Sequence, residues 1–218
     1  SSLLVNELLE SFDIYDDNII NILDPACGEA ILLEETSKMF SKKNIHNSHC
    51  FGIDVDTNVI SVNAQNFDEG KYTFVNQNTI LPSTKMGAYN YWSHRLKNVS
   101  CVIANPPWSS EKVFTRDELD RAGYHFGVGQ YDSYVLFIEL CLRLVNPNAI
   151  LAFIVPDSLF SGENKALRKF LLENTEIKVL ARLGEKLFPN VNRSTSVIIL
   201  KKSKPNEFSK TRCFRLDT

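Results

Sequence analysis

The stretch IINILDPACGEAILLEETSKMFSKK, residues 19–43, passes from a strand pattern to a helix pattern through a short turn. Residues 19–24 are mostly apolar and rich in isoleucine, which is typical of a strand that is buried on both faces. In residues 30–43, the apolar side chains that fall near one face of a helix are Ile31, Leu32, Met39 and Phe40. A strand that turns directly into an amphipathic helix is the repeating unit of an α/β protein.

The same alternation continues along the chain. Seven stretches have the strand pattern: IINILD (19–24), HCFGIDV (49–55), YTFVNQ (72–77), VSCVIA (99–104), AILAFIV (149–155), IKVLARL (177–183) and TSVIILKK (195–202). Helix patterns lie between them, at residues 30–43, 56–70, 131–146 and 162–175. Several of the strands are continuous apolar runs, so the sequence predicts a mostly parallel sheet with helices on both faces.

The last two strand patterns are joined differently. Their connection, GEKLFPNVNRS (184–194), has no helix pattern. It is also shorter than the crossover of about a dozen residues or more that parallel neighbours need, so we expect these strands to be antiparallel. The predicted fold class is α/β: a Rossmann-like, seven-stranded, mostly parallel sheet with a C-terminal antiparallel strand pair.

Length and composition indicate one globular domain, residues 1–218, with 44% hydrophobic and 23% charged residues. No apolar run approaches the roughly 18 residues of a membrane helix, and residues 1–10 lack the basic flank of a signal peptide, so we expect no membrane association. The formal net charge is −2, without the basic excess typical of proteins that bind nucleic acid through their own surface. Binding to nucleic acid would therefore need phosphate contacts from another region.

The cysteines and histidines favour neither a metal site nor a disulfide framework. The five cysteines form no CxxC pair, and four lie in apolar or strand-like stretches, where a free cysteine acts as a small hydrophobe. The four histidines are scattered along the chain. We therefore expect no bound metal and a reducing, cytoplasmic location.

The turn DPACGEA, residues 24–30, lies where the first predicted strand meets the first helix. In an open α/β sheet, ligands bind at the carboxyl ends of the strands. Small residues in this turn would let a ligand approach the backbone, and the helix N-terminus adds positive potential. An ordinary strand-to-helix turn explains the same residues equally well.

The ends of the next two strands add polar groups. Asp54, in GIDVD, ends the second strand, where a carboxylate can accept hydrogen bonds from both hydroxyls of a ribose. Its alternative role is a helix cap, but Asp56 directly precedes the helix and fits that role better, which leaves Asp54 for the ligand. Asn78, in VNQNTILP, ends the third strand with an amide that can read the edge of adenine; a simple turn residue is the alternative.

The fourth strand ends in NPPW, residues 105–108. Proline has no N–H to donate, so the strand must stop here, and two consecutive prolines fix the backbone that follows. Trp108 then places a large aromatic ring at the rim, where a strand more often ends in glycine, aspartate or serine. This sequence is unusual for a simple strand end.

DPACGEA, GIDVD, NPPW and the terminal antiparallel pair resemble the motifs of amino-methyltransferases that use S-adenosylmethionine, most closely the N6-adenine DNA methyltransferases of restriction–modification and related phage-defence systems. The motifs come in the family's order over nearly the whole chain. The resemblance implies S-adenosyl-L-methionine as the cofactor. The implied cofactor residues are Asp24, Pro25, Ala26, Cys27 and Gly28 beside the methionine part, Asp54 and Val55 at the ribose, and Asn78 and Thr79 at the adenine.

The resemblance also implies transfer of a methyl group to the exocyclic N6 of a flipped-out adenine in DNA. The Asn105 side-chain oxygen and the Pro106 carbonyl would accept hydrogen bonds from that amine. The base would stack on Trp108 and on Phe188 of the final hairpin, although simple packing is the alternative for both rings. The implied catalytic residues are Asn105, Pro106, Pro107, Trp108 and Phe188.

Two positions depart from the family pattern. Ala30 stands where the family usually has a second glycine, and Asn78 stands where aspartate is more common. The segment between Asn78 and Asn105 is too short for a target-recognition domain. We therefore expect double-stranded DNA to be read by a region beyond Thr218 or on another subunit, with a specificity or restriction subunit as a candidate partner.

Three alternatives stay open. A protein-glutamine methyltransferase also uses Asn-Pro-Pro, but more often has tyrosine at the position of Trp108. An RNA methyltransferase of the same fold is compatible with the sequence. A non-catalytic, cofactor-shaped scaffold that helps to hold DNA is favoured by Ala30 and Asn78 and disfavoured by Asp54 and the intact NPPW.

Overall fold

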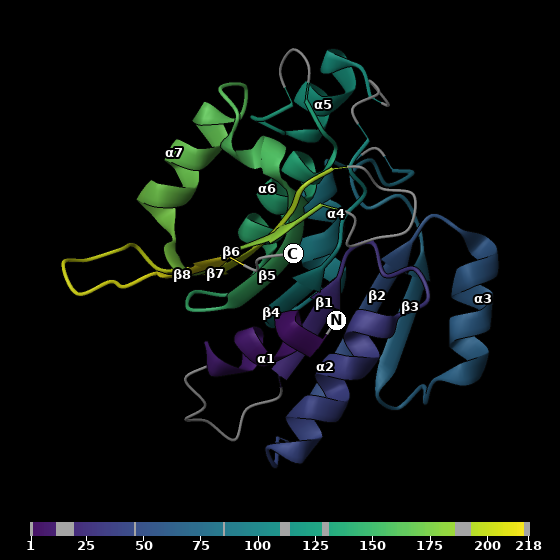
Figure 1. The fold of residues 1–218 in the computed structure, drawn as a ribbon. Helices are drawn as coiled ribbons and strands as arrows, with labels where there is room; N and C mark the ends of the chain where they lie inside the picture. Colours follow the sequence, from purple (N-terminus) through teal and green to yellow (C-terminus); the bar gives the residue numbers. More distant parts are fainter. Residues whose placement is uncertain are drawn as a thin grey trace.

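One sheet runs through the residues that the computed structural model describes, which are 2–11, 20–45, 47–84, 86–109, 114–127, 131–185 and 193–215. Its eight strands lie in the order β3-β2-β1-β4-β5-β7-β6-β8 (Figure 1). Their bounds are β1 Ile20–Asp24, β2 Ser48–Asp54, β3 Tyr72–Asn76, β4 Val99–Ala104, β5 Ile150–Pro156, β6 Glu176–Gly184, β7 Thr195–Lys201 and β8 Arg212–Arg215. From β1 the chain adds β2 and then β3 toward one edge of the sheet. It then returns to place β4 on the other side of β1, and the later strands extend toward the opposite edge. β1 and β4 therefore form the switch point at which open α/β sheets bind ligands.

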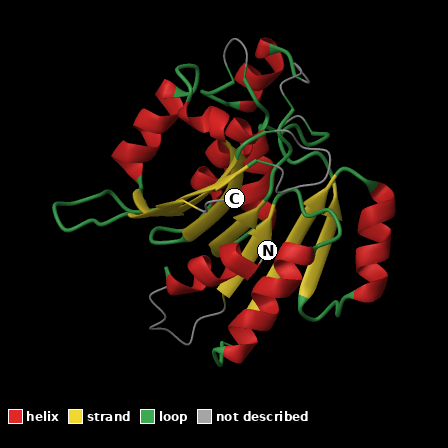
Figure 2. Ribbon diagram, in the orientation of Figure 1, coloured by secondary structure: helices red, strands yellow, loops and turns green. Residues whose placement is uncertain are grey.

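Helices cover both faces of the sheet, as the sequence predicts (Figure 2). One face packs against α1 (Ser2–Glu10), α2 (Ile31–Lys42) and α3 (Thr57–Asn66). The opposite face packs against α4 (Ala88–Arg95), α5 (Arg116–Ala122), α6 (Tyr134–Leu144), the short 3₁₀ helix η1 (Asp157–Phe160) and α7 (Lys165–Asn174). None of the helices in the described ranges has the length and apolar character needed to cross a membrane.

The central strand β5 shows why its sequence is a continuous apolar run. Its side chains alternate between two buried cores that lie on opposite faces of the sheet. The core that includes α1–α3 contains Ile150, Ala152 and Ile154. The core that includes α4–α7 contains Leu151, Phe153 and Val155. Burial on both faces leaves no position along this strand for a polar side chain.

The predicted antiparallel element is confirmed. Strand β7 pairs antiparallel with both β5 and β6, so that Ile198 lies opposite Phe153 on one side and Leu180 on the other. The predicted number of seven strands is wrong, because β8 adds an eighth that pairs parallel with β6. This short edge strand, RCFR, is largely exposed and has no apolar run to reveal it. Arg212 anchors it to α1 through ion pairs with Glu7 and Glu10.

Two local predictions need correction, and the sequence patterns also miss helix α4. The helix predicted over residues 56–70 ends at Asn66, because Phe67 turns into extended backbone and packs its ring against Tyr72 and Phe74. Asn78 lies two residues beyond the end of β3 rather than on it. Helix α4 was not predicted, because its sequence AYNYWSHR mixes polar and aromatic residues without a clear apolar stripe.

Candidate active site

A pocket of about 440 Å³ opens at the carboxyl ends of β1, β2 and β4, beside the loop that follows β3. Its lining includes nine of the residues that the sequence predicts for the site: Pro25, Ala26, Gly28, Asp54, Val55, Asn78, Thr79, Asn105 and Pro107. Five further residues were not predicted: Ile80, Ser109, Phe114, Ser133 and Phe137. The cofactor motifs and the NPPW motif therefore face one cavity of the size that small-molecule ligands occupy.

Asp54 joins the turn after β1 to the end of β2. Its Oδ2 accepts a hydrogen bond from the Gly28 N–H at 2.9 Å, and its Oδ1 accepts one from the Asp56 N–H at 3.0 Å. The expectation that Asp54 is left entirely to a ligand is therefore wrong, because its carboxylate also holds the backbone. Each oxygen keeps a second lone pair that can accept from a ligand. Asp56 is the helix cap, as predicted, and accepts from Asn58 N–H at 2.8 Å.

Gly28 has a left-handed backbone with φ of 48°, and a Cβ atom at this position would enter open space. A side chain there would be strained and would project where a ligand can approach the turn. Two residues later, Ala30 also has a left-handed backbone, with φ of 59°. This conformation explains why glycine suits that position, and it shows that alanine is accommodated in the same geometry.

Asp24 and Cys27 are buried and do not line the pocket. Asp24 Oδ1 accepts a hydrogen bond from the Ala26 N–H at 3.0 Å, and burial raises the pKa of this carboxyl to about 7. Burial also raises the pKa of the Cys27 thiol, whose backbone N–H donates to the Ile53 carbonyl at 2.9 Å. Both residues are thus buried within the turn, and their role beside the methionine part of the cofactor stays a prediction.

The loop after β3 is held by its own polar side chains. Asn78 Oδ1 accepts from the N–H groups of Ile80 and Leu81, at 3.0 and 2.9 Å. The Asn78 amide oxygen thus acts as a turn former, and only its NH₂ is left to face the pocket. Thr79 donates to the Pro25 carbonyl at 2.6 Å and ties this loop to the turn after β1.

The NPPW motif begins directly after β4. Asn105 and Pro107 are exposed at the pocket, whereas Pro106 is buried. Among the residues that the structure describes, neither the Asn105 side chain nor the Pro106 carbonyl has a hydrogen-bond partner. The Asn105 side chain is therefore a free acceptor at the pocket, and the Pro106 carbonyl follows it on a backbone stiffened by proline.

Trp108 is half-buried and does not line the pocket. Its ring packs against the apolar cores on both faces of the sheet, and its indole N–H donates to the Ile154 carbonyl at 3.4 Å. Its own carbonyl accepts a hydrogen bond from Arg193 at 3.0 Å. The structure thus holds Trp108 at the pocket's edge. Phe188, the other predicted aromatic residue, lies outside the described residues.

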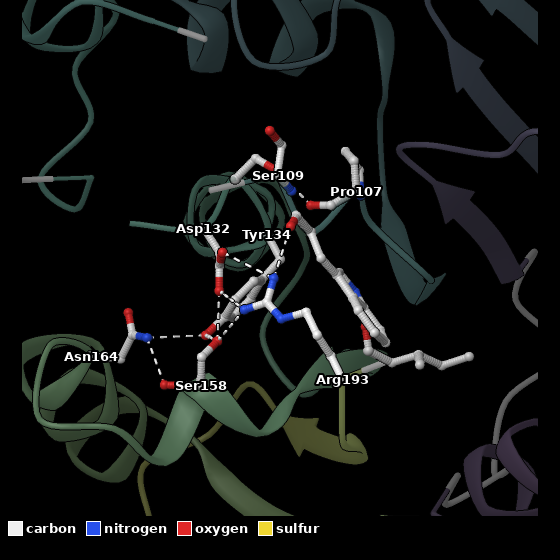
Figure 3. A network of polar contacts seen from close by, with 10 residues as sticks. Pro107, Ser109, Asp132, Tyr134, Ser158, Asn164 and Arg193 are labelled. Carbon is white, nitrogen blue, oxygen red and sulfur yellow. Dashed lines mark hydrogen bonds and ion pairs between the residues drawn. The ribbon is translucent and has the colours of Figure 1, made fainter. Parts of the chain in front are cut away.

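A polar network that was not predicted fixes the segment after the prolines (Figure 3). Ser133 Oγ donates to the Pro107 carbonyl at 2.5 Å, and the Ser133 N–H donates to the Ser109 carbonyl at 2.9 Å. Asp132 and Arg193 form an ion pair nearby, at 2.6 Å. The sequence YDSYVLF reads only as the start of a helix, so it gives no sign that Asp132 and Ser133 contact the NPPW segment.

The fold and pocket define a class I methyltransferase architecture. The protein-family model described as N-6 DNA Methylase matches residues 2–217, so the chain belongs to that family. Among the described residues, no three His, Cys, Asp or Glu side chains come together as a possible metal site.

Relatives agree with this family. The chain is 29% identical, over 94% of its length, to the type I restriction enzyme MjaVII methylase subunit of Methanocaldococcus jannaschii, and 24% identical, over 92%, to the MpnII methylase subunit of Mycoplasma pneumoniae. It spans only 36% and 39% of those two proteins. A solved structure from Listeria monocytogenes, described as a class I S-adenosylmethionine-dependent methyltransferase, has a TM-score of 0.76 and 27% identity, covering 99% of this chain and 64% of that one. These findings imply S-adenosylmethionine as the cofactor.

Proposed function

We propose that this chain transfers a methyl group from S-adenosylmethionine to the exocyclic N6 of a flipped-out adenine in DNA, as the modification domain of a restriction–modification or related system. The observation that carries the proposal is the position of Asn105 and Pro107, which line the same pocket as Gly28 and Asp54. A group bound beside Asp54 and a base held at Asn105 would therefore meet within one cavity.

The residues of the pocket fit the cofactor. The left-handed Gly28 leaves the turn open to the methionine part, and the free lone pairs of Asp54 can accept from the ribose hydroxyls. Val55 is exposed beside Asp54, and the Asn78 NH₂ can donate to a ring nitrogen of adenine. When bound, S-adenosylmethionine supplies an activated methyl group on a positively charged sulfur.

The NPPW segment fits the target amine. The lone pair of the adenine N6 is delocalised into the ring, so the amine is a poor nucleophile. Acceptors at the Asn105 Oδ1 and the Pro106 carbonyl would bind its two N–H groups and favour a tetrahedral nitrogen. The protein then contributes mainly position and hydrogen bonding. Transfer would form the N–C bond as the methyl carbon–sulfur bond breaks, and the positively charged nitrogen would then lose one proton to water.

Two aromatic residues would receive the flipped base. Trp108 lies next to the acceptors, where base stacking contributes about 1–3 kcal/mol. Phe188 would contribute a second ring from the β6–β7 connection. Double-stranded DNA would be recognised by a region outside this chain or by a specificity or restriction subunit. Such a partner is in keeping with the relatives that are named as methylase subunits, and the assembly would act in the cytoplasm.

The test is a transfer assay with S-[methyl-³H]adenosylmethionine and the protein together with the subunits that co-purify with it. Unmethylated genomic DNA, total RNA and a protein extract are offered separately, and modified nucleosides are identified by mass spectrometry. Long genomic DNA contains every short target sequence, so the unknown target is not an obstacle. Label in N6-methyladenine from DNA supports the proposal, whereas label only in RNA or in protein glutamine overturns it.

Asn105→Ala should reduce the transfer rate by about 10²–10³-fold, because it removes one of the two acceptors. Asn105 is exposed, so the substitution should leave thermal stability and cofactor affinity nearly unchanged. Asn58→Ala, an exposed asparagine on α3, is the matched control and should transfer normally. Full activity in Asn105→Ala would contradict the acceptor role.

A further inference from the structure

The side chain of Arg193 joins three segments that are far apart in the sequence (Figure 3). It lies two residues before β7, and its guanidinium donates to both oxygens of Asp132, at 3.2 and 2.6 Å. The same group donates to the carbonyl of Trp108 at 3.0 Å. A single side chain from the end of the β6–β7 connection thus contacts both the start of α6 and the last residue of NPPW.

Asp132 fixes the orientation of this guanidinium. The Asp132 side chain is only 7% exposed, so its charge requires compensation, and the two-pronged contact with Arg193 supplies it. Asp132 also accepts a hydrogen bond from Ser158 Oγ at 2.6 Å, which links the pair to η1. Because both ends of the pair are held, the N–H that points at Trp108 has little freedom.

The backbone after Pro106 is bonded at three successive carbonyls. Ser133 holds the carbonyls of Pro107 and Ser109, and Arg193 holds the one between them, at Trp108. Two of these contacts come from Ser133, whereas the one from Arg193 comes from the strand pair at the C-terminal end of the chain. The bonded carbonyls begin immediately after the Pro106 carbonyl, the acceptor proposed for the target amine.

We propose that Arg193, oriented by Asp132, is a positioning residue for methyl transfer: it fixes the Trp108 backbone and thereby the geometry of the Asn105 and Pro106 acceptors. The part of this inference that concerns methyl transfer rests on the proposed function. Its structural part, the restraint on Trp108, stands independently. Arg193 also links the backbone of the NPPW segment to the residues that lead into β7.

A second arginine–aspartate pair provides the comparison. Arg182 of β6 pairs with Asp157, at the same end of the sheet and one residue before Ser158. This pair does not contact the NPPW segment in the part of the chain that the structure describes. Equivalent substitutions at Arg182 and Arg193 therefore separate a general effect on this end of the sheet from an effect on the acceptors.

The key variant is Arg193→Lys, with Arg182→Lys as its control. Lysine keeps the charge beside Asp132 and so protects the fold, but it lacks the planar fork that reaches Asp132 and Trp108 together. Arg193→Met with Asp132→Asn is a second variant that removes the pair without leaving a buried charge. Both should lower kcat about tenfold or more while KM for DNA and the Kd for S-adenosylmethionine change less than twofold.

Acrylamide quenching of tryptophan fluorescence tests the restraint on Trp108 without any need for activity. The chain has two tryptophans, and Trp92 is fully buried, so quenching reports mainly on Trp108. Arg193→Lys should raise the quenching constant about twofold, whereas Arg182→Lys should not change it. Either unchanged quenching or unchanged kcat in Arg193→Lys would overturn the inference, as would equal losses in the Arg182 control.

The two proposals fail in different ways. If the unaltered protein methylates no adenine, the proposed function and the catalytic part of the inference fail together, and quenching alone then decides whether Arg193 restrains Trp108. If the unaltered protein methylates adenine and Arg193→Lys does so at the same rate, only the inference is overturned.

Discussion

Asp54→Asn is the substitution that best separates the two roles of this side chain. The carboxylate accepts one backbone N–H on each oxygen, from Gly28 and from Asp56. Asparagine is nearly the same size but has a single oxygen. One of the two backbone N–H groups must therefore face an NH₂ group that cannot accept its hydrogen bond.

The expected loss of stability follows from that one contact. A hydrogen bond to a charged group contributes about 1.5–3 kcal/mol, and the half-exposed position of Asp54 favours the lower end of that range. For a domain of this size, about 1.5 kcal/mol corresponds to a fall in Tm of about 3–6 °C. The ribose hydroxyls also lose a charged acceptor, which should raise the Kd for S-adenosylmethionine by about tenfold or more.

Calorimetric titration with S-adenosylmethionine and thermal unfolding measure these two effects in the same samples. Asp56→Asn is the matched control, because Asp56 is an exposed helix cap two residues away, and asparagine caps helices as well as aspartate does. The control should bind and unfold like the unaltered protein. A lower Tm with unchanged affinity in Asp54→Asn would refute the ribose role and leave Asp54 as a purely structural residue.

Two further substitutions probe the turn and strand beside the pocket. Burial raises the pKa of the Asp24 carboxyl to about 7, so the folded protein keeps a proton that the unfolded chain releases near its ordinary pKa of about 4. The contribution of Asp24 to the free energy of unfolding therefore falls as pH rises from about 4 to 7. Asp24→Asn should remove this pH dependence, which urea unfolding at several pH values measures. A difference in stability between the two proteins that does not change with pH would contradict this. Gly52→Ala should cost about 1–3 kcal/mol, because its Cβ would lie 2.7 Å from the Phe74 ring and 2.9 Å from Cys27 Sγ. Gly162→Ala, where a Cβ meets nothing within 4 Å, is the control, and an equal loss of stability there would refute the steric argument.

Much of the fold was predictable because it follows from local patterns. The apolar run of β4 matches its structural bounds, Val99–Ala104, and the short β6–β7 connection correctly predicts antiparallel pairing. Strand β8 could not be predicted, since an exposed four-residue edge strand has no apolar period. It is recognised only through its pairing with β6 and through the contact of Arg212 with α1.

The candidate site was also predictable only in part. The sequence determined that Asp54 ends one parallel strand and that Asn105 follows another. The carboxyl ends of parallel strands lie at one edge of a sheet, so their meeting in a pocket was expected. Only the tertiary structure decided which of their polar atoms are already bonded. It placed two backbone donors on Asp54 and turned the Asn78 oxygen into the loop. It also joined Arg193 to Asp132, 61 positions away in the sequence. Hydrogen-bond partners of this kind depend on distances in space, which a pattern of neighbouring residues does not contain.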